Sequence, residues 1–192
     1  DHRDDVLPLL PQAPQRKNGK RIACIGAGCA SLTVANDLLP LGYEITMFEQ
    51  WGQAGGLMRT NIPSFRLPAE VLNEEIAMIV DRGVELQLGT RIESLKKLLE
   101  EGGFDAVFVG TGAPKGKELD LPGRKEGGAN IHIGIDWLES IAFEHIKSVG
   151  RRVLIIGVGN TAMDCCRSSL RLGAADVKVM ARKPRQYFKA SE

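Results

Sequence analysis

The sequence is poor in aromatic residues and cysteine, and it contains no long apolar segment. Aromatic side chains make up 5% of the 192 residues, and there are four cysteines. Four cysteines are too few for a disulfide scaffold, and their spacing fits neither an iron–sulfur nor a zinc site. No apolar stretch approaches the roughly 20 residues that span a bilayer. Because residues 1–5 also lack the apolar core of a signal peptide, we expect a cytoplasmic protein that contacts no membrane.

An excess of either charge is also missing. The formal net charge is +1, so nothing indicates a nucleic acid or a strongly acidic partner. No histidine forms a catalytic pattern with acids or serines, so the sequence does not support a hydrolase; the histidines are His2, His132 and His145. The abundant residue is glycine, with 22 copies that gather in turns after short apolar runs.

The first such turn lies near the start of the chain. Residues 22–25 form an apolar run of the length of a buried strand, Gly26 and Gly28 follow, and apolar residues with helical spacing come next. Such a strand, glycine turn and helix can hold a dinucleotide pyrophosphate. The glycines let backbone approach the phosphates, and the helix N-terminus offers unpaired N–H groups. Ser31 stands at the third glycine position, where its side chain would keep the helix slightly farther from the strand.

An acidic residue at the end of the next predicted strand supports this interpretation. The strand covers residues 44–49 and ends in Glu49, about 20 residues after the glycine turn. A carboxylate there accepts a hydrogen bond from an adenosine ribose and repels a 2′-phosphate. The first turn therefore favours FAD or NAD over NADP, although an ordinary strand-to-helix turn remains the alternative.

The connection over residues 50–68 is long for a compact domain, so we expect it to be functional. Its glycine pair, Gly55 and Gly56, would let backbone approach a ligand. Arg59 and Arg66 are interpreted as cations near the proposed pyrophosphate, with solvated surface arginines as the alternative.

The opening pattern returns in the last third of the chain. A strand over residues 151–156 precedes Gly157 and Gly159, and a helix follows. At the position of the acid, this repeat has Arg182 and Lys183. A cationic pair can bind a 2′-phosphate, so NADP is the predicted nucleotide, although a basic strand end is a common feature.

The remaining apolar periodicities predict further elements. We expect helices over residues 69–82, 94–101, 135–146 and 163–172, and strands over 84–88, 105–109 and 176–180. The strand over 105–109 is expected to be buried. Residues 1–20 contain several prolines and predict an extended lead-in, which is either a linker from an upstream segment or a frayed terminus.

The cysteines do not predict a redox-active dithiol. Cys24 falls in the first strand and Cys29 in the phosphate turn, so neither position suits a pair beside a flavin ring. Cys165 and Cys166 are adjacent on a predicted helix, where at least one of them should pack in the core.

Five stretches carry a resemblance to a known family: Arg21–Leu32, Glu49 with residues 55–59, Asn61–Pro68, Thr111–Ala113 and Gly157–Asp164. They resemble the small (beta) subunit of NADPH-dependent glutamate synthase. The matching module of dihydropyrimidine dehydrogenase and of related NADPH–ferredoxin oxidoreductases is similar too. The resemblance covers nearly the whole chain from Lys20 onward.

The resemblance implies FAD in the first domain and NADPH in the second. It assigns FAD contacts to Gly26, Gly28, Ser31, Glu49, Gly56, Leu57, Arg59, Thr111 and Gly112. It assigns NADPH contacts to Gly157, Gly159, Asn160, Thr161, Arg182 and Lys183. It further implies that electrons pass from NADPH to FAD and then, through iron–sulfur clusters outside this chain, to a large catalytic subunit that makes glutamate. The alternatives are a ferredoxin-like acceptor or a non-catalytic nucleotide-binding module.

The implied fold class is α/β, with two Rossmann-like dinucleotide-binding domains and the NADPH domain nested within the FAD domain. The expected division is a linker over 1–20, an incomplete FAD-binding domain over 21–114, a crossing over 115–133 and an incomplete NADPH-binding domain over 134–192. The family has proline, alanine and glycine where this sequence has Cys29, Ala30 and Ser31. Its cluster-binding cysteines and its C-terminal return segment are absent here. We therefore expect an internal piece of a longer protein that is inactive in isolation.

Overall fold

The chain folds into two compact units. The computed structural model describes residues 6–182 and 184–188. The first unit runs to Arg59 and resumes over Leu67–Gly112, and the second contains Thr60–Arg66 and the chain from Ala113 onward. The segment Thr60–Arg66, called the strap below, therefore groups with the second unit although residues of the first unit flank it on both sides.

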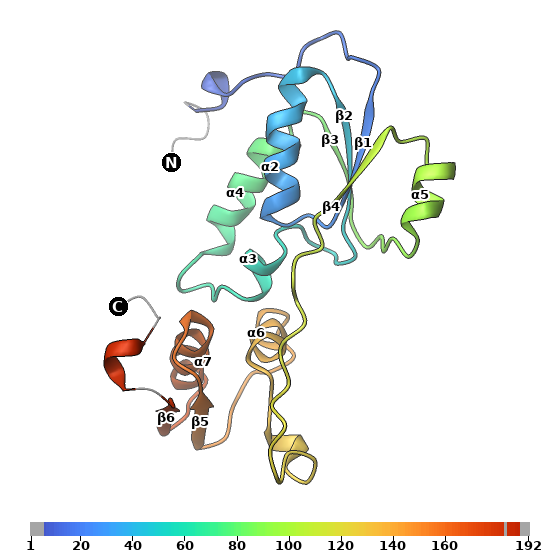
Figure 1. Cartoon of the computed structure of the whole chain (residues 1–192). Helices are drawn as coiled ribbons and strands as arrows, with labels where there is room; N and C mark the ends of the chain where they lie inside the picture. The colour runs from blue at the N-terminus through green and yellow to red at the C-terminus, as the bar shows by residue number, and fades with distance from the viewer. Residues whose placement is uncertain (1–5, 183, 189–192) are drawn as a thin grey trace. The chain divides into compact units, whose positions relative to one another are not determined.

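A four-stranded parallel sheet in the order β3-β2-β1-β4 forms the centre of the first unit (Figure 1). Its strands are β1 (Arg21–Ile25), β2 (Glu44–Phe48), β3 (Val84–Gln87) and β4 (Ala106–Val109). Ile25 pairs with Phe48 on one side and with Val109 on the other, so three strands end level with one another. In open parallel sheets, ligands bind at this carboxyl edge.

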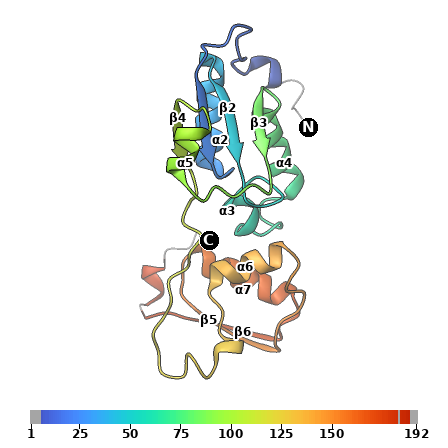
Figure 2. The ribbon, with the colours of Figure 1, turned by 90° about the vertical axis from the view of Figure 1, so that its right-hand side faces the viewer.

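Helices cover the sheet of the first unit unequally. They are α2 (Cys29–Leu38), α3 (Leu57–Thr60), α4 (Ala69–Val80) and α5 (Leu95–Glu101). Figures 1 and 2 show α2 and α4 on one face and α5 on the other. The core lies under α2 and α4, where alternate residues of β1 and β2 meet Leu32 and Leu72. The prediction of a buried fourth strand was wrong, because β4 is an edge strand and Val109 is 52% exposed.

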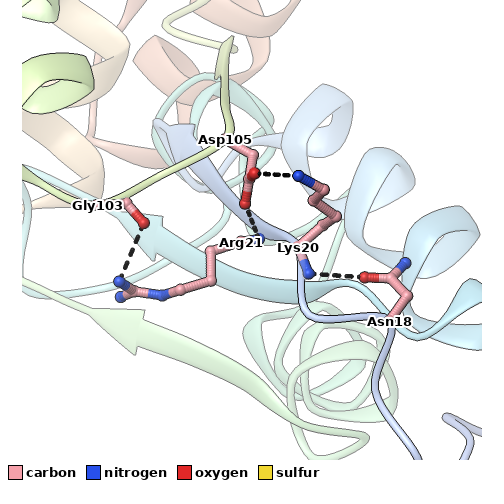
Figure 3. A network of polar contacts seen from close by, with 5 residues as sticks. All are labelled: Asn18, Lys20, Arg21, Gly103 and Asp105. Atoms are coloured by element: carbon pink, nitrogen blue, oxygen red, sulfur yellow. Dashed lines mark hydrogen bonds and ion pairs between the residues drawn. The ribbon is translucent and has the colours of Figure 1, made fainter.

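A polar network fixes the amino-terminal ends of β1 and β4 (Figure 3). The Lys20 ammonium lies 2.7 Å from the Asp105 carboxylate, whose second oxygen accepts the Arg21 N–H at 2.9 Å. Asn18 accepts the Lys20 N–H at 2.8 Å, and the Arg21 guanidinium donates to the Gly103 carbonyl at 3.2 Å. Because these groups are exposed, we assign the network a small stabilisation and a role in the register of the two strands.

The described part of the lead-in is tied to the first unit by hydrogen bonds. Arg82, which follows α4, donates to the Pro11 carbonyl at 3.0 Å and also to the side chain of Asn36 on α2. The Asn18 N–H donates to the Gly42 carbonyl at 3.0 Å. The lead-in is therefore anchored at two separate points.

The second unit contains a two-stranded parallel sheet and two longer helices. Its elements are β5 (Arg152–Ile156), β6 (Asp176–Met180), α6 (Gly134–Ala142) and α7 (Asn160–Arg171). Trp137 and Leu138 of α6 pack with Ile155 and Cys165 to form its core. Helix α6 ends four residues before its predicted end, and Glu144 just beyond it has a φ of 59°.

Short elements escaped prediction from the sequence. They are α3 and the 3₁₀ segments η1 (Leu7–Leu9), η2 (Leu39–Leu41), η3 (Gly128–Asn130) and η4 (Arg185–Tyr187). Each spans only three or four residues, which is about one helical turn. Such a segment is too short to show the repeated spacing of apolar residues by which a helix is predicted.

Candidate functional site

The first glycine turn requires Gly26 for two reasons. Its φ is +88°, a conformation that residues with a side chain rarely adopt. A Cβ at this position would also lie only 2.7 Å from the carbonyl oxygen of Gly110 and 3.4 Å from the Cα of Thr111. The Gly26 N–H donates to the Phe48 carbonyl at 2.7 Å. The turn thus meets the ends of both neighbouring strands, and it brings Thr111 beside the predicted phosphate site.

Bare backbone forms the surface of this turn. Gly28 is the N-cap of α2 in an extended conformation and makes no side-chain cap, so the first N–H groups of the helix lack an intrahelical acceptor. Gly56 has a φ of +52°, and a Cβ on it would lie 3.0 Å from the Gly28 Cα. The Gly55 N–H donates to the Ala27 carbonyl at 2.8 Å. Two segments far apart in sequence therefore meet here without side chains.

Glu49 is buried beside the same turn, with 5% of its surface exposed. One carboxylate oxygen accepts the Ala27 N–H at 2.8 Å, and the other accepts the Trp51 N–H at 3.1 Å. Glu49 thereby holds the turn after β1 and the loop after β2. Since a carboxylate oxygen has two lone pairs, acceptor capacity remains for a ribose hydroxyl. That contact stays a prediction.

Ser31 fits at the third glycine position because its neighbour in space, Gly110, has no side chain. Ser31 is fully buried, and its hydroxyl has no hydrogen-bond partner among the residues that the structure describes. A Cβ placed on Gly110 would collide with this hydroxyl. The missing side chain at Gly110 therefore provides the space that the serine occupies. The sequence offered no signal for this compensation, because the two positions are far apart in the chain.

The two arginines of the long connection fall in different units. Arg59 donates to the Ala54 carbonyl at 2.6 Å and to the Asn73 side chain at 2.6 Å, and its partial burial lowers its pKa. It therefore braces the loop of the first unit. Arg66 lies on the strap and pairs with Asp164 of α7 at 2.6 Å. Arg66 is therefore held by a carboxylate of the second unit, and the placement of either arginine beside a pyrophosphate stays a prediction.

The other predicted positions of the first site are exposed. Leu57 begins α3, and Thr111 and Gly112 follow β4 at the carboxyl edge of the sheet.

The second glycine turn repeats the geometry of the first. Gly157 has a φ of +132°, and its N–H donates to the Met180 carbonyl at 2.9 Å. Gly159 is the N-cap of α7, with φ −91° and ψ 176°, and it makes no side-chain cap. The corresponding N-cap of α2, Gly28, has φ −86° and ψ −178°. Asn160 and Thr161 form the exposed start of α7.

The two turns differ in the charge that follows their second strand. After β2 stands the buried carboxylate of Glu49, whereas after β6 stands the exposed guanidinium of Arg182. The predicted position Lys183 lies outside the described residues. The contrast is the one that the sequence predicts for a 2′-hydroxyl site and a 2′-phosphate site.

The cysteines are free thiols in contrasting settings. Burial raises the pKa of Cys24 to about 11, and burial, with the charge of Asp164 second, raises the pKa of Cys165 to about 12. Both thiols are therefore protonated at neutral pH. Cys165 packs in the second core, as predicted for one member of its pair. Cys29 is exposed at the start of α2.

Two further features are absent from residues 6–182 and 184–188. No helix there combines the length and the apolar character needed to cross a membrane. The same residues contain no group of three or more His, Cys, Asp and Glu side chains arranged to hold a metal ion.

Comparison with protein families gives a match over most of the chain. The family described as “Pyridine nucleotide-disulphide oxidoreductase” matches residues 20–191. Among solved structures, FprA of Mycobacterium tuberculosis in complex with NADPH has a similar fold, with a TM-score of 0.76. The identity is 20%, and the match covers 90% of this chain and 45% of that one.

Curated relatives are similar along nearly the whole chain. The beta subunit of the NADP(+)-dependent formate dehydrogenase of Moorella thermoacetica is 38% identical over 88% of this chain and 24% of its own length. The beta subunit of the NADPH-Fe(3+) oxidoreductase of Geobacter sulfurreducens is 34% identical over 94% of this chain and 27% of its own length. The small chain of glutamate synthase [NADPH] of Azospirillum brasilense is 32% identical over 96% and 40%. The predicted resemblance to the glutamate synthase small chain is confirmed, and the chain spans less than half of each of these relatives.

Proposed function

The chain belongs to the pyridine nucleotide-disulphide oxidoreductase family, and from this premise we propose that it is the hydride-transfer module of an NADPH-dependent flavin oxidoreductase. One observation carries the proposal. The chain builds the same strand, glycine turn and helix twice, and it places a buried carboxylate beside the first turn and an exposed cation after the second. FAD is assigned to the first turn and NADPH to the second.

The residues of the first unit fit FAD. Gly26, Gly28 and Gly56 form a cradle without side chains. A Cβ on Gly56 would meet the Gly28 Cα at 3.0 Å, whereas a Cβ on Gly26 would meet Gly110 just after β4. The N-terminus of α2 would hold the pyrophosphate, and Glu49 would accept from the adenosine ribose. FAD, when bound, supplies the two-electron acceptor for the hydride.

The second unit supplies the corresponding groups for NADPH. The uncapped start of α7 would receive the pyrophosphate, and Gly159 would let it approach the backbone. Arg182, with Lys183, would bind the 2′-phosphate through charged hydrogen bonds. Neither site requires an acid or a base from the protein, because a hydride passes directly between the two rings.

The final acceptor is proposed to be a partner subunit. The relatives above are named as subunits or chains of larger enzymes, and their names differ in the reaction that the electrons serve. Glutamate synthesis is our leading assignment, because the resemblance to that small subunit covers nearly the whole chain from Lys20 onward, with its most specific pieces at Ile62–Pro68 and Asn160–Asp164. Reduction of another acceptor, as in the ferric-iron relative, is the second candidate. Iron–sulfur clusters are expected only in parts of the protein outside this chain.

Anaerobic titration of the full-length protein tests the proposal. We expect bound FAD whose absorbance is bleached by NADPH and much more slowly by NADH. Gly26→Ala should abolish flavin binding, because its methyl group would meet the Gly110 carbonyl 2.7 Å away. Gly83→Ala is the matched control, since Gly83 also has a positive φ, of +118°, but faces open space. A protein without flavin, or a flavin that NADPH leaves oxidised, would refute the proposed function.

A further inference from the structure

The strap contacts α7 through charged side chains. The Arg66 guanidinium pairs with the Asp164 carboxylate at 2.6 Å, and the Arg171 guanidinium lies 3.8 Å above the ring of Phe65. Asp164 and Arg171 lie about two turns apart on the same side of the helix. The strap and α7 both belong to the second unit, so these contacts are internal to that unit.

The carboxylate of Asp164 is the most buried acid among the ion pairs of the described residues. Its side chain is 5% exposed, whereas every other carboxylate in those pairs is at least 36% exposed. Arg66 donates to one of its oxygens, and the other has no hydrogen-bond partner among the residues described. A buried carboxylate without a counter-charge is strongly unfavourable. Arg66 therefore compensates a charge that has lost most of its water.

This carboxylate also lies close to the end of α7 at which we place the NADPH pyrophosphate. The helix begins at Asn160, and the Cα of Asp164 is about 6 Å farther along its axis. Helical side chains lean towards the N-terminus, which shortens the separation. It is less than the screening length of about 8 Å at physiological ionic strength, and buried charges are screened even less. An uncompensated Asp164 would therefore oppose the attraction of the helix N-terminus for phosphate.

We propose that Arg66 promotes NADPH binding by neutralising Asp164 beside the pyrophosphate site at the start of α7. This inference rests on the proposed function. Arg66 acts through the carboxylate and need not touch the nucleotide, so the net charge of the pair decides the affinity. The pair is neutral in wild type, negative in Arg66→Gln, positive in Asp164→Asn, and neutral again when both substitutions are combined.

Isothermal titration of the full-length flavoprotein with NADP⁺ and with NAD⁺ at pH 8 tests the proposal. Arg66→Gln should weaken the binding of both nucleotides by about 5- to 30-fold, because both carry the pyrophosphate that the exposed negative charge repels. Asp164→Asn should bind both at least as tightly as wild type. The double variant should return to within about threefold of the wild-type dissociation constants, since its pair is neutral.

The two single variants separate this role from a purely mechanical one. Each breaks the same ion pair, so a pair that only fastens the strap predicts similar losses of affinity in both, whereas charge compensation predicts a loss in Arg66→Gln alone. Arg66→Lys should keep most of the affinity because it keeps the charge. The matched control is Arg124→Gln, which removes a positive charge from a pair of the same unit whose Glu118 side chain is 59% exposed. It should change neither dissociation constant.

The outcomes also separate this inference from the proposed function. If wild type binds NADP⁺ but Arg66→Gln binds both nucleotides as tightly, or Asp164→Asn loses as much affinity as Arg66→Gln, the compensating role is wrong and the proposed function stands. A loss confined to NADP⁺ would also overturn it, because the pyrophosphate is common to both nucleotides. If wild type does not bind NADP⁺, the proposed function itself fails. Should Arg66→Gln fail to fold, weaker binding by Asp164→Asn or by the double variant refutes the role, since neither carries an unpaired negative charge.

Discussion

Replacing Glu49 by glutamine exchanges one carboxylate oxygen for an NH₂ group at the centre of the proposed flavin site. The carboxylate holds the Ala27 N–H with one oxygen and the Trp51 N–H with the other. Glutamine keeps one acceptor oxygen and presents an NH₂ group to the second backbone donor. One of the two N–H groups must then lose its partner in a site that is 5% exposed.

The magnitude follows from these two bonds. A hydrogen bond to a charged group contributes about 1.5–3 kcal/mol, and a buried donor without a partner costs about 1–3 kcal/mol. Glu49→Gln should therefore destabilise the first unit by roughly 2–3 kcal/mol. Loss of the charged ribose acceptor should weaken FAD binding by about 10- to 100-fold. Glu49→Ala would remove both bonds, and the resulting loss of stability would approach the whole unfolding free energy of a small domain. Glutamine is therefore the better probe.

The assay combines flavin retention on dialysis with urea unfolding of the full-length protein. Glu85→Gln is the matched control, because Glu85 of β3 accepts from Thr46 and Gln87 and lies away from the glycine turn. The control should shift the unfolding midpoint and leave flavin retention unchanged. If Glu49→Gln retains FAD as tightly as wild type, Glu49 does not hold the ribose and the first-site assignment loses its acid.

Three further predictions concern separate parts of the chain. Arg182→Ala should raise the KM for NADPH by about 10- to 100-fold and leave NADH use unchanged. Adding Lys183→Ala should erase most of the preference, whereas equal losses with both nucleotides would contradict the 2′-phosphate assignment. Gly110→Ala should lower the urea midpoint of unfolding, because its methyl group meets the Ser31 hydroxyl. Adding Ser31→Gly should restore the midpoint. An unchanged midpoint in the single variant would contradict this packing. The ion pair and backbone hydrogen bond of Asp105 hold its pKa below the ordinary value. Its stabilisation is therefore complete above about pH 4 and is lost as the pH falls further, so Asp105→Asn should flatten that acid limb in unfolding midpoints.

The sequence predicted the parts of the site that depend on local geometry. Gly26 and Gly157 were found because a tight turn after a buried strand admits few residues other than glycine. The placement of Glu49 followed from the usual length of a strand, helix and strand. The six strands among the described residues appear near their predicted ranges, because apolar runs bounded by glycine are clear signals.

Features that depend on contacts distant in sequence could not be predicted. Arg66 lies a few residues from Arg59 and has the pattern of the same kind of loop cation, yet it belongs to the second unit and pairs there with Asp164. Whether a loop returns to its own unit is decided by packing that periodicity does not report. The accommodation of Ser31 by Gly110 is of the same kind, since neither position is unusual without the other.

The different burial of the two charged groups leads to a last consequence for selectivity. Glu49 acts from a nearly water-free position, where its field on a ligand is weakly screened, whereas Arg182 acts from an exposed one. Exclusion of a 2′-phosphate from the first site should therefore persist at high salt. The preference of the second site for NADPH over NADH should shrink as ionic strength rises towards 1 M, where the screening length is about 3 Å. Steady-state rates with both nucleotides across a salt series measure this ratio. A preference that is independent of salt would show that the 2′-phosphate is held in a desolvated pocket and not by the exposed guanidinium.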